Sequence, residues 1–205
     1  MARTTDLAGL TDRVAHLHDT RPSRGTLLVA ISGIDGSGKG YLTARLDAEL
    51  QARGHRVASL NIDGWLNLPF TRFNAADPPG HFYRNAIRFG DMFAQLVLPL
   101  RDTGSVEVTV DHVEETATAY ARRTYAFRDI DIILLEGIYL LGPEYAGHYD
   151  LSVWIDCSFD TALERAIRVH RRGCRLPRRF GLTKPSTSLH RRSTFALIAH
   201  ARSLM

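Results

Sequence analysis

Hydrophobic residues recur along the chain in two patterns. Short apolar runs of strand length occupy residues 26–32, 56–62, 130–135 and 151–155. Apolar residues at helical spacing occupy residues 6–19, 41–53 and 159–172. Because strands alternate with helices, and strand–helix–strand units join parallel strands, the pattern predicts a three-layer α/β domain with a mainly parallel sheet.

The middle of the chain is less regular. Residues 64–83 are rich in Asn, Pro, Gly and aromatic residues and are expected to form an irregular excursion. Residues 85–100 have a helical pattern that we expect to end at Pro99, since proline interrupts a helix interior. Residues 105–110 alternate and predict a strand of an inserted hairpin, and residues 116–123 are expected to be helical.

Charge is divided unevenly over the 205 residues, whose formal net charge is +4. Residues 1–164 carry 15 basic and 22 acidic side chains, whereas residues 165–205 carry 11 basic and no acidic ones. A protein that binds nucleic acid through a uniformly basic surface is therefore excluded. The basic C-terminal segment needs its own explanation.

The remaining composition indicates a cytoplasmic protein without a membrane partner. Cys157 and Cys174 are the only cysteines, too few for a disulfide framework, and this favours a reducing compartment. No apolar run approaches the roughly 20 residues that a membrane helix needs. No apolar segment follows Arg3, so we expect no signal peptide.

The most specific motif is a glycine-rich segment between a predicted strand and a predicted helix. It reads Gly33-Ile-Asp-Gly-Ser-Gly-Lys39 and matches the phosphate-binding loop G-x-x-x-x-G-K. Backbone N–H groups of such a loop surround phosphate oxygens, and the lysine adds a positive charge for the β- and γ-phosphates. The alternative is an ordinary glycine-rich turn, which the combination of strand, spacing, lysine and helix disfavours. The predicted nucleotide-binding residues are Gly33, Asp35, Gly36, Ser37, Gly38, Lys39, Gly40 and Tyr41.

Gly40 departs from this motif. A serine or threonine normally follows the lysine, and its hydroxyl coordinates Mg²⁺. Tyr41 is one residue further on and Thr43 almost a helical turn away, so no neighbouring hydroxyl replaces it. The loop therefore predicts phosphate binding, with Mg²⁺ held by carboxylates elsewhere or through water.

Two carboxylates end predicted strands at the sheet edge where ligands of α/β proteins bind. Asp63 follows the second strand and could accept a proton from an acceptor hydroxyl or help to hold Mg²⁺, although Asp before Gly64 is also a common turn pair. Glu136 ends an apolar strand, as in a Walker-B-type metal site, but one acid after one strand is a weak signal. Asp156 also ends a strand, and the nearby Ser158 favours helix capping there.

Over residues 26–172 the chain resembles the uridine kinase and phosphoribulokinase group of P-loop kinases. Three segments carry this resemblance, in this order: Gly33–Lys39, Asp63-Gly64-Trp65 and Glu136-Gly137-Ile138. The resemblance implies a nucleoside-kinase-like P-loop NTPase fold. It also implies ATP and Mg²⁺ as cofactors and a small-molecule hydroxyl as phosphate acceptor, with a nucleoside such as uridine as the leading candidate. Lys39 would bind the triphosphate, Asp63 would activate the acceptor, and Asp63 and Glu136 would hold the metal.

The same resemblance implies an acceptor site at residues 78–84. His81, Tyr83 and Arg84 would contact the acceptor, and the alternative for each is a surface loop residue. A lid helix would direct arginines toward phosphate: Arg165, Arg168, Arg171 and Arg172 fall in this segment, with Arg168 and Arg172 as predicted nucleotide contacts. His112, Glu114 and Glu115 form a polar cluster that either lines the acceptor pocket or is a solvated turn.

Residues 173–205 depart from the family pattern, which continues to a last apolar strand. Only the short run 195–199 is apolar, so we expect no final buried strand. Three interpretations stay open: an arginine-rich lid, a cationic arm attracted to nucleic acid, or a non-native continuation such as a shifted reading frame. We favour a lid followed by a disordered or non-native tail, with no nucleic-acid partner. The predicted organisation is residues 1–25, an N-terminal helix and loop; residues 26–172, the kinase-like domain; and residues 173–205, the tail.

Two other classes of function remain open. Gly40 favours a P-loop protein that binds nucleotide with weak or no catalysis, and the basic tail favours a nucleic-acid-associated protein. Transfer of phosphate from ATP would separate the kinase from both. No pattern in the sequence indicates an oligomeric state.

Overall fold

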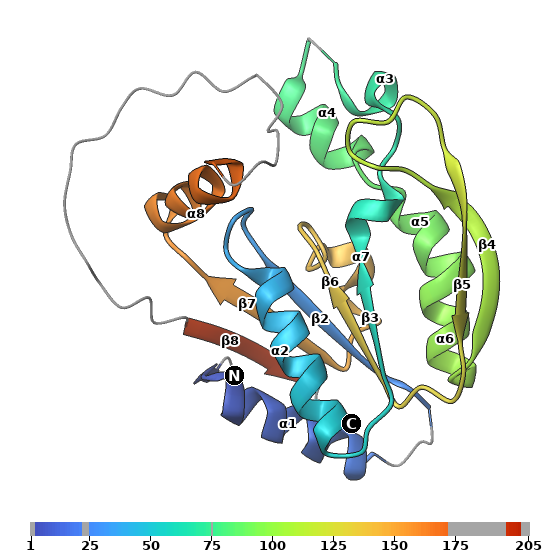
Figure 1. The fold of residues 1–205 in the computed structure, drawn as a ribbon, viewed down its shortest axis with the longest axis vertical. Helices are drawn as coiled ribbons and strands as arrows, with labels where there is room; N and C mark the ends of the chain where they lie inside the picture. Colours follow the sequence, from blue (N-terminus) through green and yellow to red (C-terminus); the bar gives the residue numbers. More distant parts are fainter. Residues whose placement is uncertain (1–2, 22–24, 75, 172–195, 202–205) are drawn as a thin grey trace.

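The computed structural model describes residues 3–21, 25–74, 76–171 and 196–201. Six strands of these residues form one sheet in the order β1-β8-β7-β2-β6-β3, and β4 and β5 form a separate hairpin (Figure 1). The strands are β1 Arg3–Thr5, β2 Leu27–Gly33, β3 Val57–Asn61, β4 Val106–His112, β5 Ala121–Phe127, β6 Ile132–Glu136, β7 Leu151–Asp156 and β8 Ala196–Ala201. Because β7, β2, β6 and β3 are parallel, the predicted mainly parallel sheet is confirmed.

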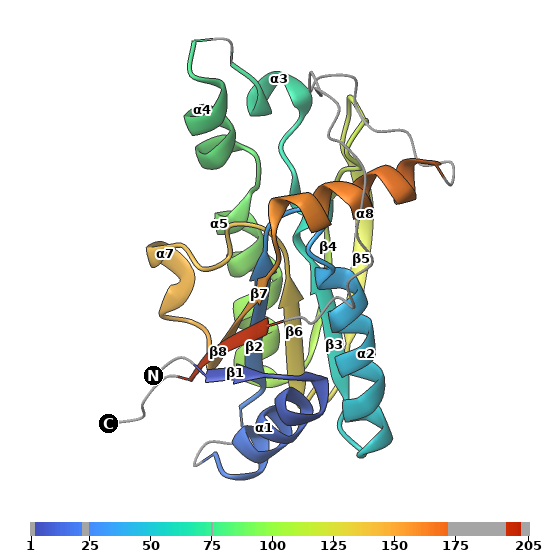
Figure 2. The same ribbon diagram turned by 90° about the vertical axis from the view of Figure 1, so that its left-hand side faces the viewer.

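Helices cover both faces of this sheet. They are α1 Leu7–Asp19, α2 Lys39–Ala52, α3 Pro69–Arg72, α4 Pro78–Asn85, α5 Phe89–Met92, α6 Leu98–Thr103, α7 Pro143–Ala146 and α8 Phe159–Arg171. Alternate residues of β2 enter different cores: Val29 packs with α1 and α2, whereas Leu28 packs with α5 and α6. The predicted three layers are therefore present. Figure 2 shows α1 at the lower end of the sheet and α8 across its upper end.

The helix expected to end at Pro99 continues to Thr103. α5 passes through a π-helical turn, Phe93–Val97, directly into α6, where Pro99 is the second residue. A π-helical turn changes the hydrogen-bond pattern just before the proline, so the missing N–H and the ring are tolerated. The helix ends instead at Gly104, which has a left-handed φ of 72°.

The excursion over residues 64–83 contains more helix than expected. Besides α3, it holds the first turns of α4, which begin with Pro78 in the first helical position. The side chain of Asp77 caps α4 by accepting a hydrogen bond from the Gly80 N–H, with an N···O distance of 3.2 Å. Proline disrupts the interior of a helix, but at its first position proline is favourable, and Pro78 begins α4 in this way.

The inserted hairpin is confirmed, but the helix expected at residues 116–123 is wrong. β5 pairs with β4 through cross-strand contacts that a helix could not make. The Thr109 and Thr124 hydroxyls are 2.8 Å apart, and Arg122 Nη1 lies 2.8 Å from Asp111 Oδ1. Tyr125 stacks on Trp65, with ring centres 6.3 Å apart. Long-range pairing has overridden local propensity.

The expectation of no final strand is also wrong, because β8 lies in the C-terminal segment. It is antiparallel to β7, where Ala199 faces Val153, and to β1, where Ile198 faces Thr4. Hydrogen-bond partners on both sides explain why a short apolar run becomes a strand. The predictions for residues 172–195 and 202–205, including Arg172, lie outside the described residues.

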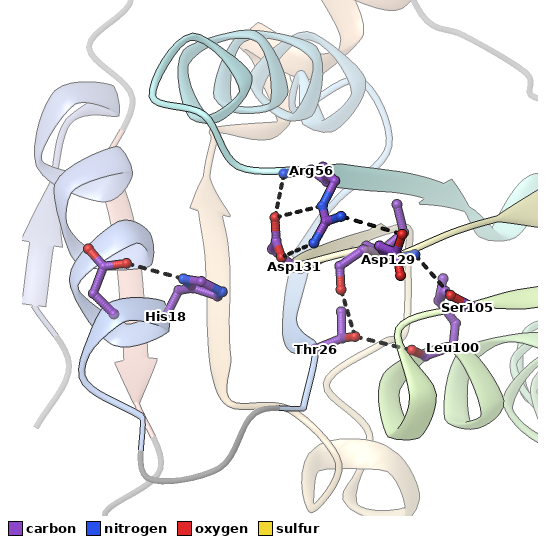
Figure 3. A network of polar contacts seen from close by, with 9 residues as sticks. His18, Thr26, Arg56, Leu100, Ser105, Asp129 and Asp131 are labelled. Atoms are coloured by element: carbon purple, nitrogen blue, oxygen red, sulfur yellow. Dashed lines mark hydrogen bonds and ion pairs between the residues drawn. The ribbon is translucent and has the colours of Figure 1, made fainter.

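Polar contacts fix the lower end of the sheet, where the parallel strands begin (Figure 3). Arg56 forms ion pairs with Asp131 at 3.1 Å and with Asp129 at 3.5 Å. The Thr26 hydroxyl lies 2.9 Å from the Ile130 carbonyl and 3.2 Å from that of Leu100. The loops that carry candidate chemistry extend from the opposite end. No helix in the described parts of the chain has the length and apolarity of a membrane span.

Candidate active site

The predicted phosphate-binding loop connects β2 to α2 (Figure 1). Gly36 and Gly38 have left-handed φ values of 74° and 96°, which glycine adopts without strain. A Cβ on Gly36 would lie 2.6 Å from the Ala162 carbonyl oxygen of α8, so a side chain there would also collide. The loop thus needs glycine for its own shape and for the close approach of α8.

Lys39 begins α2 and folds back over the loop. Its Nζ donates hydrogen bonds to the carbonyls of Ile34 at 3.0 Å and Gly33 at 3.2 Å, and lies 3.8 Å from an Asp35 oxygen. The Lys39 side chain is only 12% exposed, whereas that of Asp35 is 89% exposed. The ammonium group is therefore held at the loop, where it can contact a phosphate.

Three polar residues meet at the upper ends of β3 and β6. Asn61 is paired in register with Glu136, and its amide group donates a hydrogen bond to Glu136 Oε1. Asn61 Oδ1 in turn accepts from the Asp63 backbone N–H at 2.6 Å. Asn61 therefore bonds both to the carboxylate of Glu136 and to the backbone of Asp63, a role that the sequence did not predict. The sequence signal for this role is that Asn61, a polar residue, ends the strand two positions before Asp63.

The surroundings of Glu136 and Asp63 raise the pKa of both carboxylates. Burial raises the pKa of Glu136, the charge of Asp63 raises it further, and Lys39 opposes both effects. Burial likewise raises the pKa of Asp63, with a further increase from Asp35 and an opposing effect of Lys39. Glu136 is buried and Asp63 is exposed, and carboxylate oxygens are the hard donors that Mg²⁺ prefers. Asp63 and Glu136 therefore fit a divalent cation beside the phosphate-binding loop.

Gly40 faces the carboxylate of Glu136. A Cβ on Gly40 would lie 3.6 Å and 3.7 Å from the two carboxylate oxygens of Glu136, which is ordinary van der Waals contact. The hydroxyl that the motif normally places here would thus lie next to Glu136. Within the described residues, Thr43 Oγ1 is buried without a hydrogen-bond partner one helical turn further along α2.

The three predicted acceptor contacts lie on α4 and differ in their surroundings. His81 Nε2 is 2.8 Å from the Thr71 carbonyl, and Arg84 forms an ion pair with Asp77 at 2.7 Å. These contacts bind α4 to its own excursion. Tyr83 instead packs edge-to-face on Tyr139, with ring centres 4.9 Å apart.

Tyr139 links this aromatic pair to the phosphate-binding loop. It follows Glu136 by three residues and has a left-handed φ of 60°, unusual for a side chain of this size. Burial raises the pKa of its hydroxyl, and the charge of Asp35 raises it further. Of the three residues predicted to contact the acceptor, Tyr83 is therefore the one that touches Tyr139, which lies within electrostatic range of the loop residue Asp35.

The hairpin reaches the site through His112, the last residue of β4. Its imidazole packs so closely on Gly64, next to Asp63, that a Cβ on Gly64 would collide with it. His112 Nε2 lies 3.0 Å from Arg123 Nη1, and burial followed by the charge of Arg123 lowers the His112 pKa. This member of the polar cluster therefore lies beside the site.

α8 approaches the loop from the other side. Arg165 Nη1 donates a hydrogen bond to the Ser37 carbonyl at 2.8 Å. The predicted capping by Ser158 is confirmed, because its hydroxyl accepts from the Thr161 N–H at 3.2 Å. Arg168 lies on α8 and Arg172 outside the described residues.

A parallel sheet with this loop after β2 and carboxylates at neighbouring strand ends defines a P-loop nucleotide-binding protein. The family model described as "Phosphoribulokinase / Uridine kinase family" matches residues 28–175, most of the chain. The protein therefore belongs to the phosphoribulokinase/uridine kinase family, whose members are P-loop kinases of small molecules.

Solved structures show the same fold. A possible uridine kinase from Bacillus stearothermophilus is 22% identical with a TM-score of 0.62, covering 80% of this chain and 91% of its own. A candidate fructose transport system kinase from Silicibacter sp. TM1040 is 22% identical with a TM-score of 0.63, covering 83% of this chain and 84% of its own. At such identities the likeness extends to the fold alone. A search of curated proteins found no match.

Proposed function

We propose that the protein transfers the γ-phosphoryl group of ATP to a hydroxyl of a small molecule at the upper end of the sheet. The observation that carries this proposal is the convergence of Lys39, Asp63 and Glu136 at the ends of the adjacent strands β2, β3 and β6. The charge of Asp63 raises the pKa of Glu136 after burial has done so, and Lys39 opposes the pKa increase of both carboxylates. Phosphoryl transfer needs this combination of a phosphate-binding cation, metal-binding oxygens and a base.

Each residue has a distinct role in the proposed reaction. The loop amides and Lys39 bind the phosphates, while Asp63 accepts the proton of the attacking hydroxyl. Its raised pKa suits a base that must hold and release a proton. Asp63 and Glu136 would hold Mg²⁺, which when bound neutralises charge on the transferring phosphate. Arg165 acts through the Ser37 carbonyl as a positioning residue for the loop.

For the acceptor we propose a nucleoside such as uridine. Tyr83 and Tyr139 present aromatic rings beside the loop, exposed to 51% and 38%, and bases stack on aromatic side chains. His112 adds a polar group on the Asp63 side. The similarity to a possible uridine kinase supports the same class, and the similarity to a candidate fructose transport system kinase makes a sugar the competing acceptor.

A second candidate function is nucleotide binding with weak or no catalysis. Gly40 favours it, because this chain lacks the hydroxyl next to Glu136 that the motif normally supplies. Binding through the loop does not need that hydroxyl, whereas efficient use of Mg²⁺ does.

Phosphate transfer from labelled ATP to nucleosides, fructose and pantothenate tests the proposal, with Lys39→Met as control for contaminating kinases. We expect a phosphorylated product with one acceptor class and none from Lys39→Met. ATP binding without transfer to any acceptor would refute the kinase proposal in favour of the second candidate. Equal transfer by both proteins would show that the activity belongs to a contaminant.

A further inference from the structure

Two histidines and an aspartate form a cluster at the opposite end of the molecule from the candidate active site. His18 and Asp19 close α1, and His55 lies between α2 and β3, just before the residues that start the strand. One ligand atom from each of the three side chains lies within 4.8 Å of the other two. The proposed kinase reaction uses none of them. We propose that these residues bind a divalent transition-metal ion such as Zn²⁺, which fastens α1 to the turn between α2 and β3.

The distances match what such an ion requires. Bonds of about 2.1 Å at a tetrahedral angle put two donor atoms about 3.4 Å apart and two imidazole centres about 5 Å apart. His18 Nδ1 lies 3.2 Å from Asp19 Oδ1, and Figure 3 shows this contact as the dashed line that ends at the labelled His18. The His18 and His55 rings are edge-to-face with centres 4.9 Å apart. Small side-chain adjustments would therefore bring three donors onto one ion, with a fourth position for water.

The backbone holds the donors in place. After α2, the N–H groups of Gly54 and His55 bond back to the Gln51 and Leu50 carbonyls at 2.9 Å and 3.2 Å, which fixes the turn that carries His55. His18 lies in the last turn of α1, and its side chain is 29% exposed, compared with 65% for Asp19. Two donors on ordered backbone reduce the entropy lost on metal binding.

The surrounding electrostatics favour a cation. The cluster lies at the C-terminal end of α1, where the helix dipole attracts positive charge. The carboxylate of Asp131, the residue before β6, lies within electrostatic range of His18. Arg56 is the neighbouring cation, and its charge is offset by ion pairs with Asp131 and Asp129. Imidazole with one carboxylate selects Zn²⁺ and similar ions over Mg²⁺, which prefers oxygen ligands.

The ion would complete an existing contact between α1 and α2. Thr11 donates a hydrogen bond to Glu49 at 2.8 Å, and Arg53 pairs with Asp12 at 2.7 Å. Glu49 lies in α2 and Arg53 follows its last residue, so both contacts join α1 to the segment that leads to His55. A metal would thus act as a third clamp at the helix ends, independent of nucleotide.

Calorimetric titration of the full, tag-free chain with ZnCl₂ in excess Mg²⁺ tests this inference. Mg²⁺ occupies oxygen sites such as the Asp63–Glu136 pair, and the Glu136→Gln variant must bind Zn²⁺ like the original chain. We expect one Zn²⁺ per chain, with His18→Gln and His55→Gln each weakening binding at least about 10-fold. The matched control is His16→Gln, an exposed histidine on the same helix outside the cluster, which must bind as the original chain does.

Thermal melting and Co²⁺ absorption provide measurements that do not depend on the variants folding equally well. At about 100 times the dissociation constant, Zn²⁺ should raise the Tm of the original chain by about 5–10 °C. Co²⁺ should give the visible bands of a four-coordinate site with nitrogen ligands. Absence of Zn²⁺ binding, or binding and Tm shifts unchanged in both His18→Gln and His55→Gln, overturns the proposal.

Discussion

Gly40→Ser restores the hydroxyl that the phosphate-binding motif normally has, and the structure has room for a side chain at this position. Gly40 is in the first turn of α2 without a left-handed φ, so its backbone accepts other residues. The new Cβ would lie 3.6 Å from Glu136 Oε1, without a clash. A serine hydroxyl on that Cβ can therefore reach the carboxylate that we propose as a metal ligand. We therefore expect the Gly40→Ser protein to bind Mg²⁺ with higher affinity in the presence of nucleotide.

The size of the effect follows from these contacts. Replacing glycine by serine in a helix gains about 0.5 kcal/mol of stability, and by alanine about 1 kcal/mol. A hydrogen bond from the serine to the nearly buried Glu136 adds about 1.5 kcal/mol. Gly40→Ser and Gly40→Ala should thus both raise the Tm. Only the serine adds a metal ligand, for which we expect about a 10-fold gain in Mg²⁺ affinity, equivalent to about 1.4 kcal/mol.

The assay measures nucleotide binding and phosphate transfer as a function of Mg²⁺ concentration in three proteins: the original chain, Gly40→Ala and Gly40→Ser. Alanine supplies the Cβ and the helix propensity without the oxygen, so it is the matched control. The half-saturating Mg²⁺ concentration should fall in Gly40→Ser and stay unchanged in Gly40→Ala. Equal Mg²⁺ dependence of the two variants would refute the argument that Gly40 is a missing ligand position next to Glu136.

Three further predictions concern neighbouring residues. Asp63→Asn should lower kcat by about 10²- to 10⁴-fold while calorimetry without Mg²⁺ shows unchanged ATP affinity, because the base is lost and the phosphate-binding loop is intact. Since the native pKa of Glu136 is raised, stability falls as pH rises from its ordinary value of 4.5 through the native pKa. Glu136→Gln should therefore melt at a higher temperature than the original chain at pH 7, and this advantage should vanish below pH 4.5. Arg165→Lys keeps the charge but loses the planar guanidinium that binds the Ser37 carbonyl, and nucleotide titration should show about 10-fold weaker binding.

Local sequence patterns are sufficient to predict the central part of the fold. The run 26–32 is apolar throughout because β2 is buried on both faces between two cores. The glycines and Lys39 identify the phosphate-binding loop because the conformation itself demands those residue types. Asp63 and Glu136 are predictable as strand-end carboxylates, since the ends of parallel strands meet at one edge.

Elements that depend on distant partners are not predictable in this way. β8 is a strand because β7 and β1 lie on either side of it, and β5 because it pairs with β4. Neither partnership is encoded in the local apolar pattern, so residues 116–123 resemble a helix and residues 195–199 resemble no element. The bridging role of Asn61 likewise arises from the register of β3 with β6, which sets it opposite Glu136.

The two ends of the sheet divide stability and chemistry between them. At the lower end, Arg56 forms ion pairs with Asp131 and Asp129, so a cation lies beside each of these carboxylates. At the upper end, burial raises the pKa of both Asp63 and Glu136, with further increases from Asp35 on Asp63 and from Asp63 on Glu136, so ionising these carboxylates costs the ligand-free fold stability. Two neighbouring carboxylates destabilise the ligand-free fold by charge repulsion, but the same two negative groups suit the binding of a metal ion. The same upper end that we assign to catalysis is thus the place where a neutral substitution should stabilise the protein.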